Sequence, residues 1–77
     1  MEAPQTFGEK AVGLSLNPTG DDAVANCKKE FAATIDRMNE LRSKNPGSME
    51  IYRMTGIAID QAQTAQMWAV KAMTWRD

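Results

Sequence analysis

Histidine is absent from the sequence and cysteine occurs once, at Cys27, so the disulfides and metal sites that usually stabilise a very small protein are missing. A chain of 77 residues forms one domain and buries too little apolar surface to be stable by that means alone. Disulfides and structural metal sites need several cysteines or histidines. Self-association is the means that remains, and a lone cysteine suits a reducing cytosol.

Long apolar runs and a strong excess of one charge are also lacking. No stretch approaches the roughly 18 apolar residues that a membrane span needs, and residues 1–6 do not form a secretion signal. Nine Lys and Arg against ten Asp and Glu give a net charge of −1, which argues against binding of long nucleic acid. A small anionic ligand would need only a few local cations.

The side chains needed for catalysis are scarce as well. Without histidine there is no obvious base or metal ligand, and no glycine-rich phosphate loop is present. The acidic residues lie at predicted helix starts or among polar helical positions, where caps and solvated faces explain them. We therefore expect a protein that is not an enzyme, with no cofactor and no metal site.

Glycine and proline are concentrated in residues 1–20, which hold three of the five glycines and two of the three prolines. This segment is predicted to be an arm with one or two helical turns around residues 7–12. Thr19 is followed three residues later by Asp22, a spacing typical of a helix cap. A long helix is therefore expected to begin near residue 20.

Two long helices are predicted after the arm. Val24, Cys27, Phe31, Ile35 or Thr34, Met38 and Leu41 recur at helical spacing and indicate a first helix over about 20–43. Residues 44–48 contain Pro46 and Gly47 and predict a turn. Ser48 is a plausible cap for a second helix over about 48–74, in which Gly56 suggests a close contact. The predicted fold is all-α: an arm (1–20) and an antiparallel two-helix hairpin (21–77).

The second helix carries more than one non-polar stripe. A seam of mainly small residues is formed by Ile51, Thr55, Ala58, Ala62, Ala65, Ala69 and Ala72. A neighbouring stripe includes Ile57, Trp68 and Trp75, and Met67, Val70 and Met73 widen the apolar arc. One hairpin partner cannot cover this arc, so we expect several hairpins to assemble into a homo-oligomeric helical bundle.

A few residues of the arm and the first helix suit a small phosphate ligand. Lysine ammonium groups would meet the phosphates, a helix start would offer amide donors, and an aromatic ring would stack on a base. The same lysines also fit solvent-exposed helix positions, and the tryptophans fit packing better than base stacking. The candidate ligand-binding residues are Phe7, Lys10, Asn17, Thr19, Lys28 and Lys29.

The segment AQMWAVKAMTW, residues 65–75, resembles the C-terminal signature of the small phage anti-CBASS sponges, whose hairpin domain is shared with the anti-Thoeris sponges. FGEKAVG at residues 7–13, NPTG at residues 17–20 and the Lys-rich first helix leading to Ile35 and Asp36 occur in the same order as in that family. The resemblance spans nearly the whole chain, and the Trp-Ala-Val-Lys segment is its most specific part.

The resemblance implies a helical hairpin that assembles as a homohexamer and sequesters cyclic di- and trinucleotide immune messengers intact. It also implies an aromatic residue of the arm over the dinucleotide and a lysine of the first helix at its phosphates. Phe7 and either Lys28 or Lys29 are the nearest matches. The expected location is the cytoplasm of an infected bacterial host, where messenger captured by the protein no longer activates the CBASS effector.

Two other functions remain open at this point. A helical protein–protein interaction module would use the same alanine seam and tryptophans, and a sponge of this kind could take a cyclic ADP-ribose signal instead. The sequence does not specify the preferred cyclic nucleotide, its bases and linkage, or the number of protomers.

Overall fold

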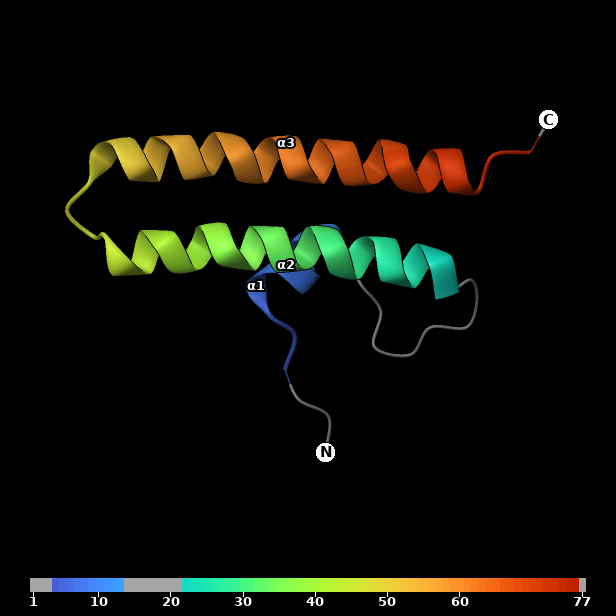
Figure 1. Cartoon of the computed structure of the whole chain (residues 1–77), viewed down its shortest axis with the longest axis horizontal. Helices are drawn as coiled ribbons and strands as arrows, with labels where there is room; N and C mark the ends of the chain where they lie inside the picture. Colours follow the sequence, from blue (N-terminus) through green and yellow to red (C-terminus); the bar gives the residue numbers. More distant parts are fainter. Residues whose placement is uncertain (1–3, 14–21, 77) are drawn as a thin grey trace.

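Three α-helices make up the computed structural model, which describes residues 4–13 and 22–76: α1 (Phe7–Val12), α2 (Asp22–Lys44) and α3 (Met49–Met73). In Figure 1, α2 and α3 lie side by side and run in opposite directions. The described residues contain no strand, so the all-α prediction holds for them. The end of α2 and both ends of α3 lie within one residue of the predicted positions.

The connection between α2 and α3 has local causes. Ser48 caps α3, its hydroxyl accepting a hydrogen bond from the Ile51 amide at 3.2 Å. At the other side of the turn the Asn45 side chain donates to the carbonyl of Leu41 at 2.9 Å, which satisfies one of the unpaired carbonyls at the end of α2. The predicted cap at the start of α2, Thr19, lies outside the described residues.

The short helix α1 is defined at both ends by its own sequence. The Thr6 hydroxyl accepts from the Glu9 amide at 3.0 Å, and the Glu9 carboxylate accepts from the Thr6 amide at 2.8 Å, which is a capping box. Gly13 ends the helix in the left-handed conformation, with φ of 69°, where glycine is favoured. The helical turns expected around residues 7–12 are therefore present.

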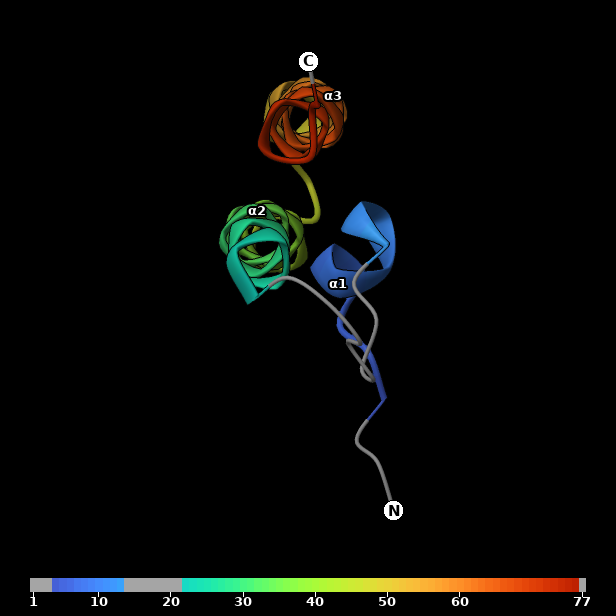
Figure 2. The same ribbon diagram turned by 90° about the vertical axis from the view of Figure 1, so that its right-hand side faces the viewer.

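The core forms where all three helices meet. Val12 of α1, Ala32 and Ile35 of α2, and Ile59 of α3 are buried, and Ile35 has no exposed surface. Figure 2, viewed along the hairpin, shows α1 beside α2 with α3 above them. The Gln63 side chain of α3 donates to the Ala11 carbonyl at 3.0 Å and ties α1 to the hairpin.

The buried face of α3 overlaps the predicted alanine seam only in part. Thr55 of the seam is buried and Ala62 packs against the core, whereas Ala65 and Ala72 are exposed. The other buried residues of α3, Ile59 and Gln66, lie outside the seam. On α2, Leu41 at the end of the predicted apolar face is 39 % exposed.

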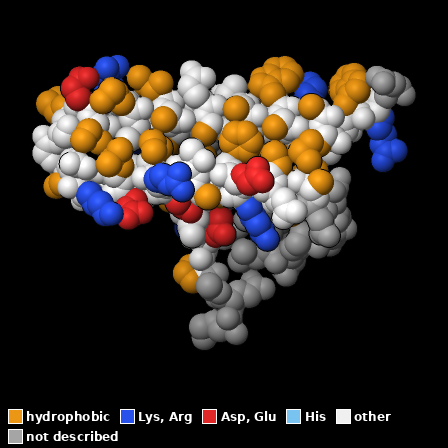
Figure 3. Space-filling model, viewed as in Figure 1, with side chains coloured by type: hydrophobic (Ala, Val, Ile, Leu, Met, Phe, Trp, Pro, Cys, Tyr) orange, Lys and Arg blue, Asp and Glu red, His pale blue; other side chains and the backbone are white. Residues whose placement is uncertain are grey.

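Large apolar side chains stay exposed along α3. They are Met49, Tyr52, Met54, Ile57, Met67, Trp68, Met73 and Trp75, the last of which lies just beyond the end of the helix. In Figure 3 hydrophobic side chains gather over α3, while most charged side chains on this face lie over α2. The wide apolar arc expected of this helix is present and uncovered in the single chain. None of the described helices combines the length and the hydrophobicity needed to cross a membrane.

Candidate functional site

The contact between α1 and α2 positions the predicted ligand residues. The Gly8 amide donates to Asp36 Oδ1 at 2.6 Å, which holds the start of α1 against the middle of α2. Gly8 sits so close to α2 that a Cβ atom at this position would collide with the carbonyl of Ala32. Glycine is therefore required here for the close approach of the two backbones.

Lys28 lies at the opposite end of α1. Its Nζ is 3.4 Å from the carbonyl oxygen of Gly13, the residue that ends α1. The carbonyl end of a helix carries partial negative charge and attracts a cation, although this contact is long and exposed. Because a lysine ammonium has three donors, one weak bond leaves donors that can bind an anion.

The other predicted ligand residues are not gathered into one cluster. Phe7 is 47 % exposed at the start of α1, while Lys28 meets the end of that helix. Lys10 and Lys29 are exposed. Asn17 and Thr19 lie outside the described residues. Within one chain, the structure therefore joins Lys28 to the end of α1 and leaves Phe7 at the other end.

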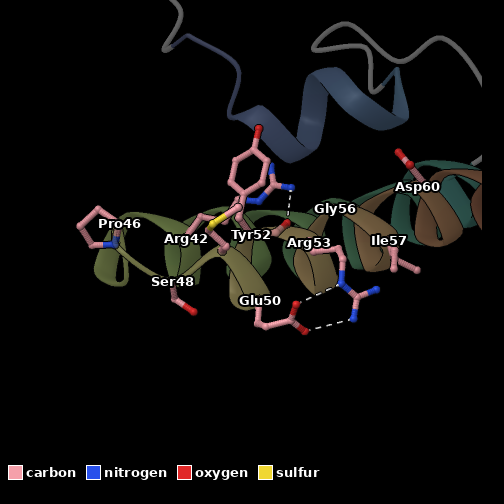
Figure 4. Close-up of a pocket in the computed structure, with 10 residues that line it drawn as sticks. Arg42, Pro46, Ser48, Glu50, Tyr52, Arg53, Gly56, Ile57 and Asp60 are labelled. Atoms are coloured by element: carbon pink, nitrogen blue, oxygen red, sulfur yellow. Dashed lines mark hydrogen bonds and ion pairs between the residues drawn. The ribbon is translucent and has the colours of Figure 1, made fainter.

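An open groove of about 610 Å³ lies elsewhere, near the turn end of the hairpin (Figure 4). Of the predicted ligand residues that the structure describes, none lines it. Its walls carry charges of both signs, and the Arg53 guanidinium is 3.1 Å from the Glu50 carboxylate. The residues that line it are Arg42, Pro46, Ser48, Met49, Glu50, Tyr52, Arg53, Gly56, Ile57 and Asp60.

Arg42 links the end of α2 to the start of α3 beside this groove. Its Nε donates to Thr55 Oγ1 at 2.6 Å, its Nη2 donates to the Tyr52 carbonyl at 2.9 Å, and the guanidinium lies 4.0 Å from the Tyr52 ring centroid. A Cβ atom on Gly56 would be 2.7 Å from Nη2. The close contact suggested by Gly56 is thus a contact with Arg42, a partner that periodicity did not identify.

An exposed ion pair on α2 shifts the pKa of a carboxyl group. Lys44 donates to the exposed Glu40 carboxylate at 2.9 Å, and this hydrogen bond lowers the pKa of Glu40. Among residues 4–13 and 22–76, no three His, Cys, Asp or Glu side chains are grouped so that they could hold a metal ion.

Comparison with known proteins gives no relative from which a function could be transferred. No family model, no curated protein and no solved structure matches this chain.

Proposed function

We propose that this chain is a cyclic-oligonucleotide sponge: a homo-oligomeric helical protein that binds cyclic di- or trinucleotide immune messengers and releases them unaltered. The proposal rests on the resemblance of residues 7–13, 17–20 and 65–75 to the phage anti-CBASS sponges. The structural observation that supports it best is the placement of Lys28 at the end of α1, with its ammonium 3.4 Å from the Gly13 carbonyl.

The charge of the molecule is compatible with a small anionic ligand. Each cyclic dinucleotide carries two phosphates, so a few lysines are sufficient where long nucleic acid would need many. Lys28 contacts the carbonyl at the end of α1, Lys10 lies in the last turn of that helix, and Lys29 follows Lys28 in sequence. Ammonium groups bind phosphate strongly because the hydrogen bond is charge-assisted.

A ligand pocket shared between protomers reconciles the positions of Phe7 and Lys28. One hairpin offers too little surface to enclose a cyclic dinucleotide, which needs a concave site. If protomers associate, Phe7 of one chain and Lys28 of another can approach the same ligand. The uncovered apolar side chains of α3 support such an association.

Sequestration accounts for the action without any chemical step. Bound messenger is withdrawn by mass action, and the effector stays inactive while free messenger remains below its activating level. The sponge must therefore be abundant relative to the messenger or bind it much more tightly than the effector does. The cytoplasm of an infected bacterial host is the compartment in which such a protein would act.

The test is isothermal titration of the purified protein, with its mass fixed by light scattering, against cyclic dinucleotides, cyclic trinucleotides and a cyclic ADP-ribose derivative. A linear dinucleotide is the control ligand, and chromatography of the denatured complex checks that the ligand is unaltered. Tight binding of a cyclic ligand to an oligomer supports the proposal. Recovery of a cleaved ligand would refute sequestration.

Lys28→Ala with Lys29→Ala should weaken that binding by about tenfold or more and leave the mass unchanged, because a hydrogen bond to a charged group contributes about 1.5–3 kcal/mol. Lys44→Ala is the matched control, since Lys44 is an exposed lysine at the far end of α2 that pairs with Glu40. Equal affinity in the double variant would remove these lysines from the site.

An interaction module is the second candidate, favoured by the exposed tryptophans and methionines of α3. It would bind another protein through this surface and ignore cyclic nucleotides. If no ligand of the titration panel binds, the interaction module is favoured over the sponge.

A further inference from the structure

We infer that two copies of this chain pair in antiparallel orientation through the outer side of α3, with Ile57 of each copy seated beside Trp68 of the other. The inference rests on the self-association contained in the proposed function, and it specifies the face, the direction and the residues in contact. It does not depend on which ligand is bound.

The surface in question is a continuous exposed stripe on α3, here called the outer stripe. At about 100° per residue, Ile57 lies about 180° around the helix from the buried Gln66, so the stripe faces away from α2. All of its members are exposed in the single chain. They are Glu50, Met54, Ile57, Gln61, Thr64, Trp68, Lys71 and Trp75.

Two hollows on the outer stripe are lined by residues with the spacing of helix-pairing sites. One hollow, of about 250 Å³, is lined by Thr64, Met67, Trp68 and Lys71, and another, of about 340 Å³, by Trp68, Lys71, Ala72 and Trp75. Both sets are spaced i, i+3, i+4 and i+7. In paired helices a side chain of one helix enters a hole formed by four residues of the other.

The side chains that would fill these hollows are present on the same helix. The stripe alternates steps of four and three residues from Glu50 to Trp75, and it has the same spacing when read backwards. Two antiparallel copies therefore place Ile57 over the hollow centred between Met67 and Trp68. Met54 of the same copy then faces the hollow around Lys71. A two-fold axis near the middle of α3 repeats both contacts.

The charges along the helix favour the antiparallel direction. Residues 49–61 hold Glu50, Arg53 and Asp60, a net charge of −1, whereas residues 62–77 hold Lys71, Arg76 and Asp77, a net charge of +1. An antiparallel pair sets the acidic half against the basic half. A parallel pair would set like against like, which is unfavourable.

Lys71 fits this arrangement without being buried as an isolated charge. Its Nζ lies 5.2 Å from the centroid of the Trp68 ring, so the ammonium already sits over an aromatic face. In the antiparallel pair it lies about one helical turn from Glu50 of the other copy. The aliphatic part of its side chain can cover Met54 while the charge stays near solvent.

Disulfide trapping of the full chain tests the pairing. In a Cys27→Ala background, one preparation carries Met54→Cys and another carries Lys71→Cys, and the two are mixed under reducing conditions and then oxidised. The mixture should give a covalent dimer, because a disulfide needs Cα atoms about 4.4–6.8 Å apart. Neither preparation alone should link, since identical positions would lie about 26 Å apart along the pair, or 17 steps of about 1.5 Å.

Two outcomes would overturn the inference. Linking within each single preparation would mean a parallel pair, and no linking in the mixture would mean that the outer stripes do not meet. As a second measurement, Ile57→Lys should weaken self-association about tenfold or more by sedimentation analysis. An unchanged association constant would also count against the pairing.

The same preparations separate this inference from the proposed function. A covalent dimer that binds no cyclic nucleotide would refute the sponge and leave the pairing intact. An oligomer that binds cyclic nucleotides but does not link in the mixture would leave the sponge intact and refute the pairing.

Discussion

The two sides of α3 distribute their apolar residues in the opposite way to a typical amphipathic helix. The inner side, against α2, buries Thr55, Ile59 and Gln66, of which two are polar. The outer side exposes the large apolar side chains of Ile57, Trp68 and Trp75 between polar residues of the outer stripe. An amphipathic helix of a monomeric protein normally directs its largest apolar residues inward.

This reversal indicates how the sequence divides its apolar residues. The inner side of α3 places Ile59 in the core and buries Thr55, whose hydroxyl donates to the Ile51 carbonyl at 2.6 Å. The large side chains of the outer side stay exposed in the single chain. On the inferred pairing, fold and assembly would depend on different faces of one helix.

The sharpest test of this comparison uses two isoleucines on α3. Ile59 is 6 % exposed and Ile57 is 48 % exposed, so the same Ile→Ala change can be compared on the buried and on the exposed side of α3. Ile59→Ala should lower the free energy of unfolding by about 2–5 kcal/mol, because it leaves a cavity in the core. Ile57→Ala should lower it by less than about 1 kcal/mol at high dilution. Urea denaturation measures both.

Protein concentration is the control variable for this pair. The effect of Ile57→Ala should grow as concentration rises, because an interface residue adds to stability only in the assembled state. The effect of Ile59→Ala should not. Similar losses for both variants at every concentration would contradict the division between the two faces.

Gly8→Ala tests whether the packing of α1 against α2 contributes to the stability of the core. The added Cβ would collide with the Ala32 carbonyl and disturb the hydrogen bond from the Gly8 amide to Asp36. We expect a loss of about 1–3 kcal/mol, measured by denaturation. Gly47→Ala is the matched control, because nothing lies within 4 Å of a Cβ at that position. Equal effects of the two substitutions would show that α1 contributes no packing.

A smaller effect is expected at the turn end, where Arg42 and Gly56 meet. In an Arg42→Ala background, Gly56→Ala should stabilise by about 1 kcal/mol, the ordinary preference of a helix for alanine. With Arg42 present this gain should be lost, because the new Cβ lies 2.7 Å from Nη2. Denaturation of all four proteins gives the coupling. Identical effects of Gly56→Ala in both backgrounds would exclude the contact.

The smallest effect concerns Glu40 and Lys44 on the exposed side of α2. The hydrogen bond from Lys44 lowers the pKa of Glu40 below 4.5 in the folded state. The pair therefore adds stability above about pH 4.5, and this is lost as the pH falls through the lowered value. In Lys44→Gln, the pKa of Glu40 measured by NMR titration should move back toward 4.5. No change on substitution would show that the ion pair does not form in solution.

The course of the chain was largely predictable from local chemistry. Proline and glycine at residues 46 and 47 end one helix, Ser48 begins the next, and both signals act within a few residues. Which side of α3 is buried could not be predicted, because small and large apolar residues occupy several stripes of this helix. The buried side includes the polar residue Gln66, and it is determined by where α1 and α2 pack.

Less of the candidate site follows from the sequence. The position of Lys28 at the end of α1 depends on how α1 docks, and that in turn depends on the close contact of Gly8 with Ala32. Arg42 was missed because its partners, Thr55 and the Tyr52 carbonyl, are more than nine residues away in the chain. Gly56 was the one local sign of that contact.

The short helix α1 depends on the hairpin for its stability. A helix of six residues is far shorter than the roughly 12–15 that an isolated helix needs in water. The capping box and Gly13 define where the helix begins and ends. Its stability must come from the hairpin, through the hydrogen bond from the Gly8 amide to Asp36 and the one from the Gln63 side chain to the Ala11 carbonyl. Unwinding of α1 and its release from the hairpin should then be a single event, so that its amide protons exchange together, at one common rate of opening.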